Sequence, residues 1–185
     1  MKLFLKPSLA ILFAATVFTT SSCSNDEDPL PENEEELITT LKLTMVPQGG
    51  GTTVTASYRD LDGDGGANPV ITGAQLAANK TYEVTVQVLD ESKSPAEDIT
   101  AEVQEEGHEH QFFYVPSPGL NLTVTSTDKD SNNLPIGITT RMMTTSSSTG
   151  TLQVVLKHQP GLKNATSTIN TGETDVEVTF PVQIQ

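Results

Sequence analysis

The sequence predicts an all-β fold, an antiparallel, immunoglobulin-like β-sandwich, with a closed β-barrel as the alternative. The first observation is an alternation of apolar and polar residues with period two, which recurs from residue 37 to residue 185. The second is that clusters of glycine, proline and asparagine separate the alternating segments, as turns do. Strands with one apolar and one polar face are typical of antiparallel sheets that expose one face to water.

The alternating segments give the predicted strands in chain order. They are residues 41–45, 53–58, 82–88, 99–103, 120–124, 152–156 and 176–184, with turn clusters at 47–51, 63–69, 116–119, 132–135 and 160–164. The last strand is the clearest, because its apolar positions alternate with Glu177, Thr179 and Gln183. Helical spacing is nearly absent, and the best helical candidate, residues 73–79, is too short to be stable alone.

Residues 1–22 have the form of a lipoprotein signal peptide. Lys2 and Lys6 precede an apolar stretch at residues 9–17, and small polar residues follow it. The apolar stretch is too short to span a bilayer, which needs about 20 residues of helix. Cys23 is the only cysteine, so it cannot form a disulfide within the chain. Its position predicts lipidation, and the alternative is a cleaved signal that leaves a free thiol.

Residues 23–36 form an acidic segment, which the sequence predicts to be a disordered, lipidated linker. A serine followed by several acids directly after the cysteine resembles the surface-export signal of Bacteroidetes-type lipoproteins. The resemblance implies a lipid anchor in the outer membrane facing the cell exterior, with the periplasmic face as the alternative. Residues 37–185 then make one domain of ordinary size.

The charge balance excludes one class of partner. The formal net charge is −14, which repels nucleic acid phosphates and attracts cations. We therefore expect no nucleic acid partner, and the membrane as a partner only through the lipid anchor.

Four segments together resemble small Bacteroidetes-type surface lipoproteins that carry the label "type 1 periplasmic binding fold superfamily". These segments are residues 58–66, 91–100, 110–113 and 171–176. The resemblance implies a surface or periplasmic location and an association with TonB-dependent uptake systems, with a TonB-dependent receptor as a partner. The label describes an α/β fold of two domains, whereas the length and period-two pattern of this chain predict one all-β domain.

The densest group of potential metal ligands lies at residues 105–110. In a strand, His108 and His110 would share one face about 7 Å apart and could converge on one ion. Glu106 or Glu102 could add a carboxylate, and His158 could arrive from a strand distant in sequence. Such a ligand set suits zinc, copper or nickel.

The alternative is that these histidines are exposed polar residues in a turn, which Gly107 and the flanking acids favour. The pattern also makes a conditional prediction. If Phe113 and Val115 face the core, His110 and Phe112 point outward together with His108.

A second candidate site is a calcium loop formed by Asp60, Asp62 and Asp64, whose carboxylates alternate before a glycine. The closing glutamate of an EF-hand would fall at position 71, which is Ile71, so this is not an EF-hand. The alternative is an Asp/Gly turn, because both residues favour tight turns.

Catalytic signals are scarce. The sequence contains no G-x-S-x-G motif, no phosphate-binding loop and no thiol nucleophile apart from the predicted lipidation site. We therefore expect a non-enzymatic surface lipoprotein that assists binding or uptake of a ligand, with a divalent metal as the most concrete candidate. The alternative function is a structural or adhesive module that binds protein or glycan without metal chemistry.

Overall fold

The computed structural model describes residues 37–63 and 65–185. These residues lie within one compact unit, Glu34–Gln185. The predicted signal peptide at 1–22, Cys23, the acidic linker to residue 36 and Asp64 lie outside the described residues. In the part of the chain that the structure describes, no helix is long and apolar enough to cross a membrane.

The first sheet is built from seven antiparallel strands. Its main order is β3-β2-β1-β5-β9-β8, and the short β6 pairs with the end of β5. The strands are β1 (Thr40–Pro47), β2 (Val54–Arg59), β3 (Val70–Thr72), β5 (Thr81–Asp90), β6 (Glu97–Asp98), β8 (Leu122–Ser126) and β9 (Thr139–Thr144).

The second sheet has four strands in the order β4-β11-β10-β7. These strands are β4 (Ala74–Leu76), β7 (His110–Pro116), β10 (Ser148–His158) and β11 (Glu173–Ile184). β11 pairs antiparallel with β10 and parallel with β4, and this is the one parallel pairing among the described strands. The helical candidate at 73–79 contains β4 instead.

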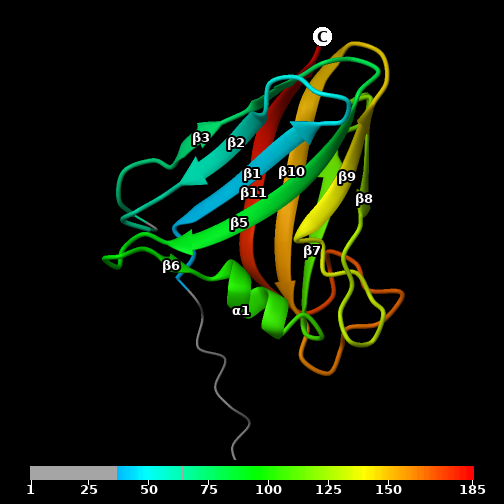
Figure 1. Cartoon of the computed structure of the whole chain (residues 1–185). Coiled ribbons are helices and arrows are strands. Elements are labelled where there is room, and N and C mark those ends of the chain that lie inside the picture. Colours follow the sequence, from blue (N-terminus) through cyan, green and yellow to red (C-terminus); the bar gives the residue numbers. More distant parts are fainter. Residues whose placement is uncertain (1–36, 64) are drawn as a thin grey trace, which may run out of the picture. The chain divides into compact units, whose positions relative to one another are not determined.

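The two sheets face each other, with β1 and β5 in front of β10 and β11 in Figure 1. This is the predicted immunoglobulin-like β-sandwich, and the two separate sheets exclude the closed-barrel alternative. Alternate residues of the strands fill the space between the sheets, as the period-two pattern predicts. Fully buried examples from both sheets are Leu41, Leu43, Val84, Met142, Leu152, Leu156, Phe180 and Ile184.

One predicted strand is a helix. Residues 99–103 were expected to alternate as a strand, but α1 (Thr100–Glu105) occupies this segment. Ile99 and Val103 are both buried, whereas Ala101 between them is exposed. Apolar residues four apart lie on one face of a helix, so the same two residues fit a helical period. The prediction failed because a segment this short cannot distinguish the two periods.

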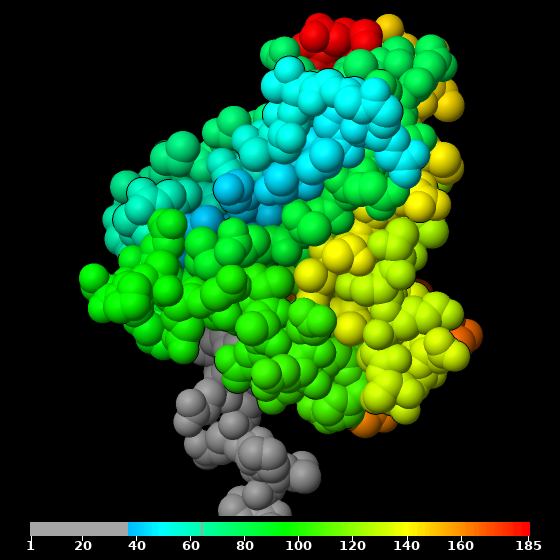
Figure 2. Space-filling view, viewed as in Figure 1, coloured from blue at the N-terminus to red at the C-terminus, as the bar shows by residue number. Residues whose placement is uncertain are grey.

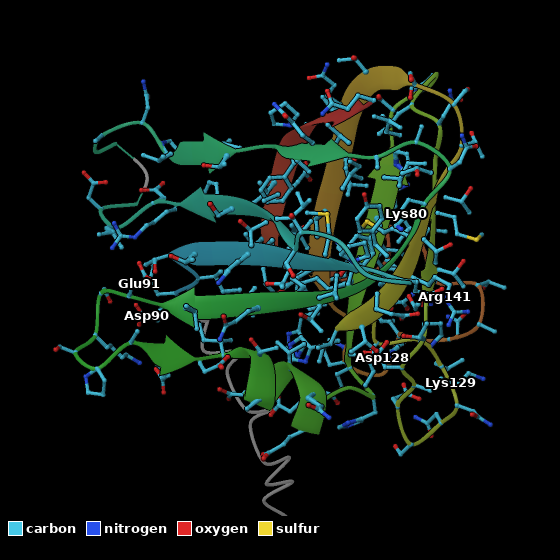
Figure 3. All side chains as sticks on the ribbon, turned by 45° about the horizontal axis from the view of Figure 1, so that its top comes forward. Lys80, Asp90, Glu91, Asp128, Lys129 and Arg141 are labelled. Atoms are coloured by element: carbon cyan, nitrogen blue, oxygen red, sulfur yellow. The ribbon has the colours of Figure 1, made fainter. Side chains whose placement is uncertain are left out.

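The side chain of Thr100 attaches α1 to the edge of the sandwich. Its hydroxyl accepts a hydrogen bond from the backbone N–H of Val88 at 2.9 Å and donates to the carbonyl of Val88 at 3.2 Å. These bonds occupy backbone groups of β5 that no neighbouring strand takes at this position. Figure 3 shows the same strand with Lys80 at one end and Asp90 and Glu91 at the other, the end from which the chain continues toward α1.

The helix closes the end of the sandwich at which β10 ends and β7 begins (Figure 1). In the space-filling view of Figure 2, the green residues around α1 and the yellow-green residues of loop 127–138 lie side by side at this end. The turn between α1 and β7 therefore lies where the helix and loop 127–138 meet.

Candidate functional site

The histidine-rich segment forms a tight turn between α1 and β7. Residues 106–109 make the turn, and the N–H groups of Glu109 and His110 both donate to the carbonyl of Glu106, at 2.8 and 3.2 Å. A Cβ on Gly107 would lie 2.6 Å from Cδ1 of Ile136, so only glycine lets the turn pack this closely against the neighbouring loop. His108 therefore lies in the turn, outside the strand on which the predicted His108–His110 spacing depended.

His110 and His158 lie opposite each other on neighbouring strands. His110 is the first residue of β7 and pairs in register with His158, the last residue of β10. Their rings stack with centroids 4.6 Å apart and planes 12° from parallel. His158 thus arrives from a strand distant in sequence, as the sequence analysis anticipated.

β7 turns the side with His110 and Phe112 toward the core, which is the opposite of the side expected from the sequence. His110 is only 5% exposed and Phe112 only 1%, whereas Val115 is 39% exposed. The premise that Phe113 and Val115 face the core was wrong, because the inner side of β7 is the one that carries His110 and Phe112. Tyr114 is half-buried on this side, and its hydroxyl donates to the carbonyl of Gly137 at 2.7 Å.

His110 is a buried, neutral histidine. Burial, together with the charge that His158 can carry, lowers the pKa of His110 to about 4. Its Nδ1 lies 3.3 Å from the carbonyl oxygen of Glu106. A carbonyl oxygen only accepts hydrogen bonds, so this contact assigns the ring proton to Nδ1. The Nε2 atom faces Oδ2 of Asp175 at 3.9 Å.

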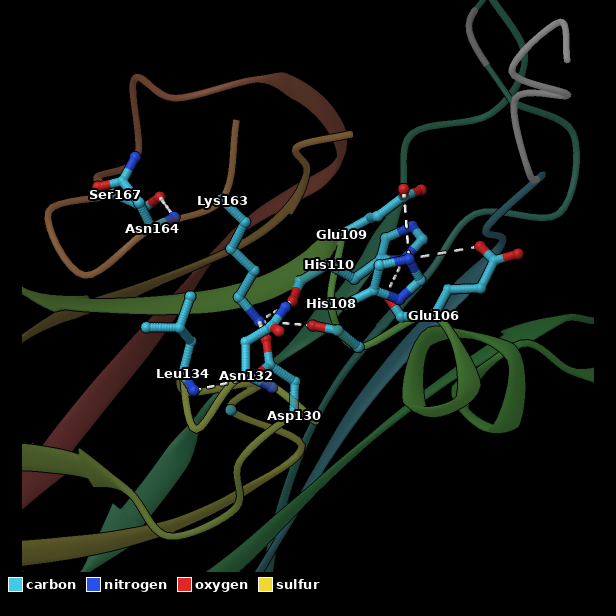
Figure 4. A network of polar contacts seen from close by, with 12 residues as sticks. Glu106, His108, Glu109, His110, Asp130, Asn132, Leu134, Lys163, Asn164 and Ser167 are labelled. Carbon is cyan, nitrogen blue, oxygen red and sulfur yellow. Dashed lines mark hydrogen bonds and ion pairs between the residues drawn. The ribbon is translucent and has the colours of Figure 1, made fainter. Parts of the chain in front are cut away.

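The carboxylate of Glu109 lies between two other imidazoles. Its Oε1 is 3.4 Å from Nε2 of His108, and its Oε2 is 3.6 Å from Nε2 of His158. The side chain of His108 is 50% exposed, while that of His158 is mostly buried. Figure 4 shows Glu106, His108, Glu109 and His110 gathered at the turn. Sequence reasoning missed Glu109, because a strand would have directed it away from both neighbouring histidines.

Lys163 connects the turn to a neighbouring loop. Its ammonium donates to the carbonyl oxygens of Gly107 and His110 and forms an ion pair with Asp130 at 2.9 Å. Figure 4 shows Lys163 pointing toward Asp130, on the side of the turn away from Glu109. The contacts join loop 159–172, loop 127–138 and the histidine turn. No local sequence signal identifies this pair, since each residue lies in an ordinary polar loop.

Loop 159–172 also carries a buried polar side chain without a hydrogen-bond partner among the described residues. Gln159 is fully buried, and neither polar atom of its side-chain amide has a hydrogen-bond partner among the described residues. Its backbone is fully engaged, because its N–H donates to the carbonyl of Glu109 at 2.6 Å and its carbonyl accepts from Leu162 and Lys163. The backbone of Gln159 therefore fixes the position of Glu109 relative to β10.

The predicted calcium loop uses its carboxylates in hydrogen bonds of the turn. Oδ1 of Asp60 accepts from the N–H of Gly63 at 3.0 Å, and Oδ2 of Asp62 accepts from the N–H of Ala67 at 2.8 Å. These contacts are those of an Asp/Gly turn. Asp64 lies outside the described residues, so the calcium site remains a prediction.

The predicted transition-metal ligands are only partly brought together. Glu106 lies 3.8 Å from Nδ1 of His110, but Glu102 is exposed on α1 and His108 belongs to the separate contact with Glu109. Among residues 37–63 and 65–185, no group of three or more His, Cys, Asp and Glu side chains is already arranged to hold a metal ion.

Comparisons with known proteins add little to this description. No protein-family model matches the sequence, and no curated protein matches it. Among solved structures, the chain aligns with the crystal structure of the S-layer protein SbsC domains 4 and 5 at 12% identity. The alignment covers 77% of this chain and 75% of that chain with a TM-score of 0.29, which is too low to support an argument about fold or function.

Proposed function

We propose that this protein is a non-enzymatic, lipid-anchored module of the cell envelope that binds a small ligand at the turn between α1 and β7. Cys23 would carry the lipid, and the acidic residues 24–36 would separate the sandwich from the membrane. Outer-membrane anchoring that faces the exterior, and assistance to a TonB-dependent receptor, belong to the same proposal. The outward-facing anchor is supported by the resemblance of the acidic segment after Cys23 to a surface-export signal. The TonB-dependent receptor is supported by the resemblance of residues 58–66, 91–100, 110–113 and 171–176.

The observation that carries the ligand-binding function is a pair of solvent-accessible polar side chains on a turn whose backbone is held by hydrogen bonds. His108 and Glu109 reach solvent, while Lys163 and Gln159 hold the backbone of the turn from beneath. A binding site gains affinity when its backbone is ordered before the ligand arrives, because less conformational entropy is lost on binding. A cation is the ligand class that best suits the turn, since Glu102, Glu105, Glu106 and Glu109 lie in α1 and the turn.

A structural or adhesive module is the second candidate, and one feature of the first sheet favours it. β3 lies at the edge of this sheet, where Val70 is 67% exposed and Ile71 44%. An exposed apolar edge strand can pair with a strand of another protein. In this alternative the edge of β3 would be the functional surface, and the histidine turn would serve only to close the sandwich.

The anchoring part of the proposal is tested by metabolic labelling with a palmitate analogue in a bacterial host that processes lipoproteins. We expect label on the wild-type chain and none on a Cys23→Ser variant. A wild-type chain that remains unlabelled overturns the lipid anchor. Protease treatment of intact cells then distinguishes the two faces of the membrane, because only a chain that faces outward is degraded.

The choice between the two functions is tested at the sites themselves. We expect the wild-type chain and a Val70→Thr, Ile71→Thr variant to bind divalent cations equally, because β3 lies outside the histidine turn. If the chain binds no cation at any site, and the threonine substitutions abolish binding to envelope proteins, the adhesive function replaces the first proposal. The same cation series, extended to calcium, tests the loop of Asp60, Asp62 and Asp64.

A further inference from the structure

We propose that the open edge of β3, the side that faces away from β2, binds an extended, basic segment of a partner protein as an added strand. This inference goes beyond ligand binding at the histidine turn, because it gives a protein partner a surface of its own. It rests on the second candidate function, for which it names the chemistry of the partner. β3 (Val70–Thr72) forms one end of the strand order of the first sheet.

The backbone of β3 offers hydrogen-bonding groups that the described chain does not use. β3 lies at the outer edge of the first sheet, where it pairs with β2 on one side (Figure 1). In an antiparallel pair, alternate residues direct their N–H and C=O groups away from the neighbouring strand. Within the described ranges, residues 70–72 make no backbone hydrogen bond outside the sheet ladder. A strand of another molecule can therefore pair with the outward groups.

The side chains of β3 are exposed on both faces of the sheet. Val70 is 67% exposed and Ile71 44%, and Thr72 is exposed as well. Ile71 lies opposite Tyr58, which packs against the core, so Ile71 is on the inner face. Val70 lies opposite Arg59 and is on the outer face. An added strand with apolar residues would cover Ile71 and extend the core beyond β3.

β3 is already fixed before a partner arrives. It pairs in register with β2, and the chain continues directly after it into β4, which belongs to the second sheet. Gly73 makes this change of sheet, and a Cβ there would lie 2.2 Å from the carbonyl oxygen of Pro181 on β11. β3 is therefore held by β2 on one side and, through Gly73, by β11. This order lowers the entropic cost of adding a strand.

The opposite edge of the first sheet is less suited to a partner. β8 forms that edge, and it exposes Thr123 and Thr125. Its apolar residues Leu122 and Val124 pack against the core instead. A strand added beside β8 would therefore bury less apolar surface than a strand added beside β3.

The charges near β3 define the chemistry of the partner. Residues 60–79 contain three aspartates and no lysine or arginine. Two of the aspartates, Asp60 and Asp62, lie in the loop between β2 and β3, and Arg59 at the end of β2 is paired with Glu91. A segment that carries lysine or arginine is attracted to this end of the sheet, and the net charge of −14 speeds its encounter. Two copies of this chain repel each other for the same reason.

The test measures binding of the full chain to capped synthetic peptides by fluorescence anisotropy. The probe is a peptide of alternating lysine and valine. Two peptides are compared with it: its fully N-methylated form, which cannot donate backbone hydrogen bonds, and a peptide of alternating glutamate and valine. We expect saturable binding at micromolar concentration of the probe alone. Hydrogen exchange at the amides of residues 70–72 should become slower when the probe is added.

Two variants locate the binding surface. Ile71→Lys should weaken binding of the probe by about tenfold or more, because it removes an apolar contact and adds a like charge beside the open edge. Val115→Lys is the matched control, since it makes the same change of charge at a 39% exposed residue of β7, an edge strand of the second sheet. Its affinity should stay within about twofold of wild type. Circular dichroism checks that both variants retain their strands.

Four results would overturn the inference. They are the absence of saturable binding, equal binding of the N-methylated peptide, equal weakening by Ile71→Lys and Val115→Lys, and unchanged hydrogen exchange at residues 70–72. Self-association of the wild-type chain that Ile71→Lys abolishes, measured by analytical ultracentrifugation, would assign the open edge to a second copy instead.

Failure of this inference is distinguishable from failure of the proposed function. Loss of envelope-protein binding in the Val70→Thr, Ile71→Thr variant, without binding of the probe, would keep the adhesive module and reject the basic segment. Cation titration and palmitate labelling report on the histidine turn and the anchor, so their outcome leaves the open edge of β3 standing.

Discussion

Lys163 and Asp130 form an ion pair in which each side chain is only 1% exposed, although both residues lie in loops. Burial raises the pKa of the Asp130 carboxyl, but hydrogen bonds from Lys163 and from the N–H groups of Leu134 and Asn132 outweigh this effect and hold the pKa below its ordinary value. The carboxylate is therefore charged while buried, and Lys163 is the cation that balances it.

Removing this cation should destabilise the sandwich. Lys163→Met preserves most of the side-chain volume but leaves Asp130 with a buried, uncompensated charge, which typically costs about 3–5 kcal/mol. We expect a loss of this size in the free energy of unfolding measured by urea denaturation. The double variant Lys163→Met, Asp130→Asn removes both charges and should recover part of the loss. A single Lys163→Met variant that loses less than about 1 kcal/mol would show that the pair is no stronger than an exposed one.

The stability of the fold should decrease as the pH falls from 6.5 to about 4, because of His110. The ordinary pKa of this histidine is 6.5, and in the folded protein it is lowered to about 4, so the unfolded chain binds more protons between these values. The contribution is complete above pH 6.5 and is lost by pH 4, a change of roughly 3 kcal/mol. The groups that face the ring are His158 on β10, Asp175 on β11, and the carboxylates Glu102, Glu106 and Glu109 of α1 and the turn.

Urea denaturation at several pH values measures this slope. His110→Phe keeps an aromatic ring against His158 but cannot bind a proton, so its stability should depend much less on pH in this range. His108→Ala serves as the control and should retain the slope, since His108 is half exposed. An unchanged slope in His110→Phe would assign the acid sensitivity to another group.

Gly172 should tolerate no side chain. Its φ is +73°, and a Cβ there would overlap the carbonyl oxygen of His158. Gly161 has a similar φ of +66° but nothing within 4 Å of a Cβ. Gly161→Ala should therefore cost only the backbone strain, about 1–2 kcal/mol, whereas Gly172→Ala should cost clearly more. Thermal unfolding of the two variants isolates the overlap, and equal losses would contradict the close approach of loop 159–172 to His158.

Thr100 should be essential for docking α1 against β5. Thr100→Val removes the hydroxyl that bonds to Val88 and leaves the Val88 N–H without this acceptor, while the Val88 carbonyl keeps its bond from the N–H of Ile99. An unpaired buried group of this kind costs about 1–3 kcal/mol. Thr100→Ser retains the hydroxyl and should lose much less. Hydrogen exchange at the Val88 amide is the most direct measurement, because this N–H should exchange faster in the valine variant alone.

The long strands β5 and β11 were predictable from sequence because their alternation is long and regular. The period-two pattern at 82–88 and 176–184 places every apolar residue of those segments inside the sandwich. Residues 99–103 misled the same reasoning, since Ile99 and Val103 satisfy a helical spacing equally well. The parallel pairing of β4 with β11 was not predictable, because three residues carry no periodic signal and the direction of pairing depends on the rest of the fold.

The candidate site was predictable in its location but not in its composition. The sequence identified the turn and its histidines because unusual residues are concentrated there. It could not identify His110 as buried, because that depends on which side of β7 faces the core, and Phe112 and Phe113 are equally apolar. It could not find Lys163, Asp130 or Gln159, since each acts through contacts between loops that are far apart in sequence.

The pairing of β4 with β11 has a consequence for the order in which the protein assembles. β11 is the central partner of both β10 and β4, and Ile184 at its end lies beside Leu76. A nascent chain therefore lacks β11, the strand that joins β4 to β10, until residue 184 has left the ribosome. β7 and β10 can pair before β11 is made, but nearly all of the domain must be synthesised before β4 can join the second sheet.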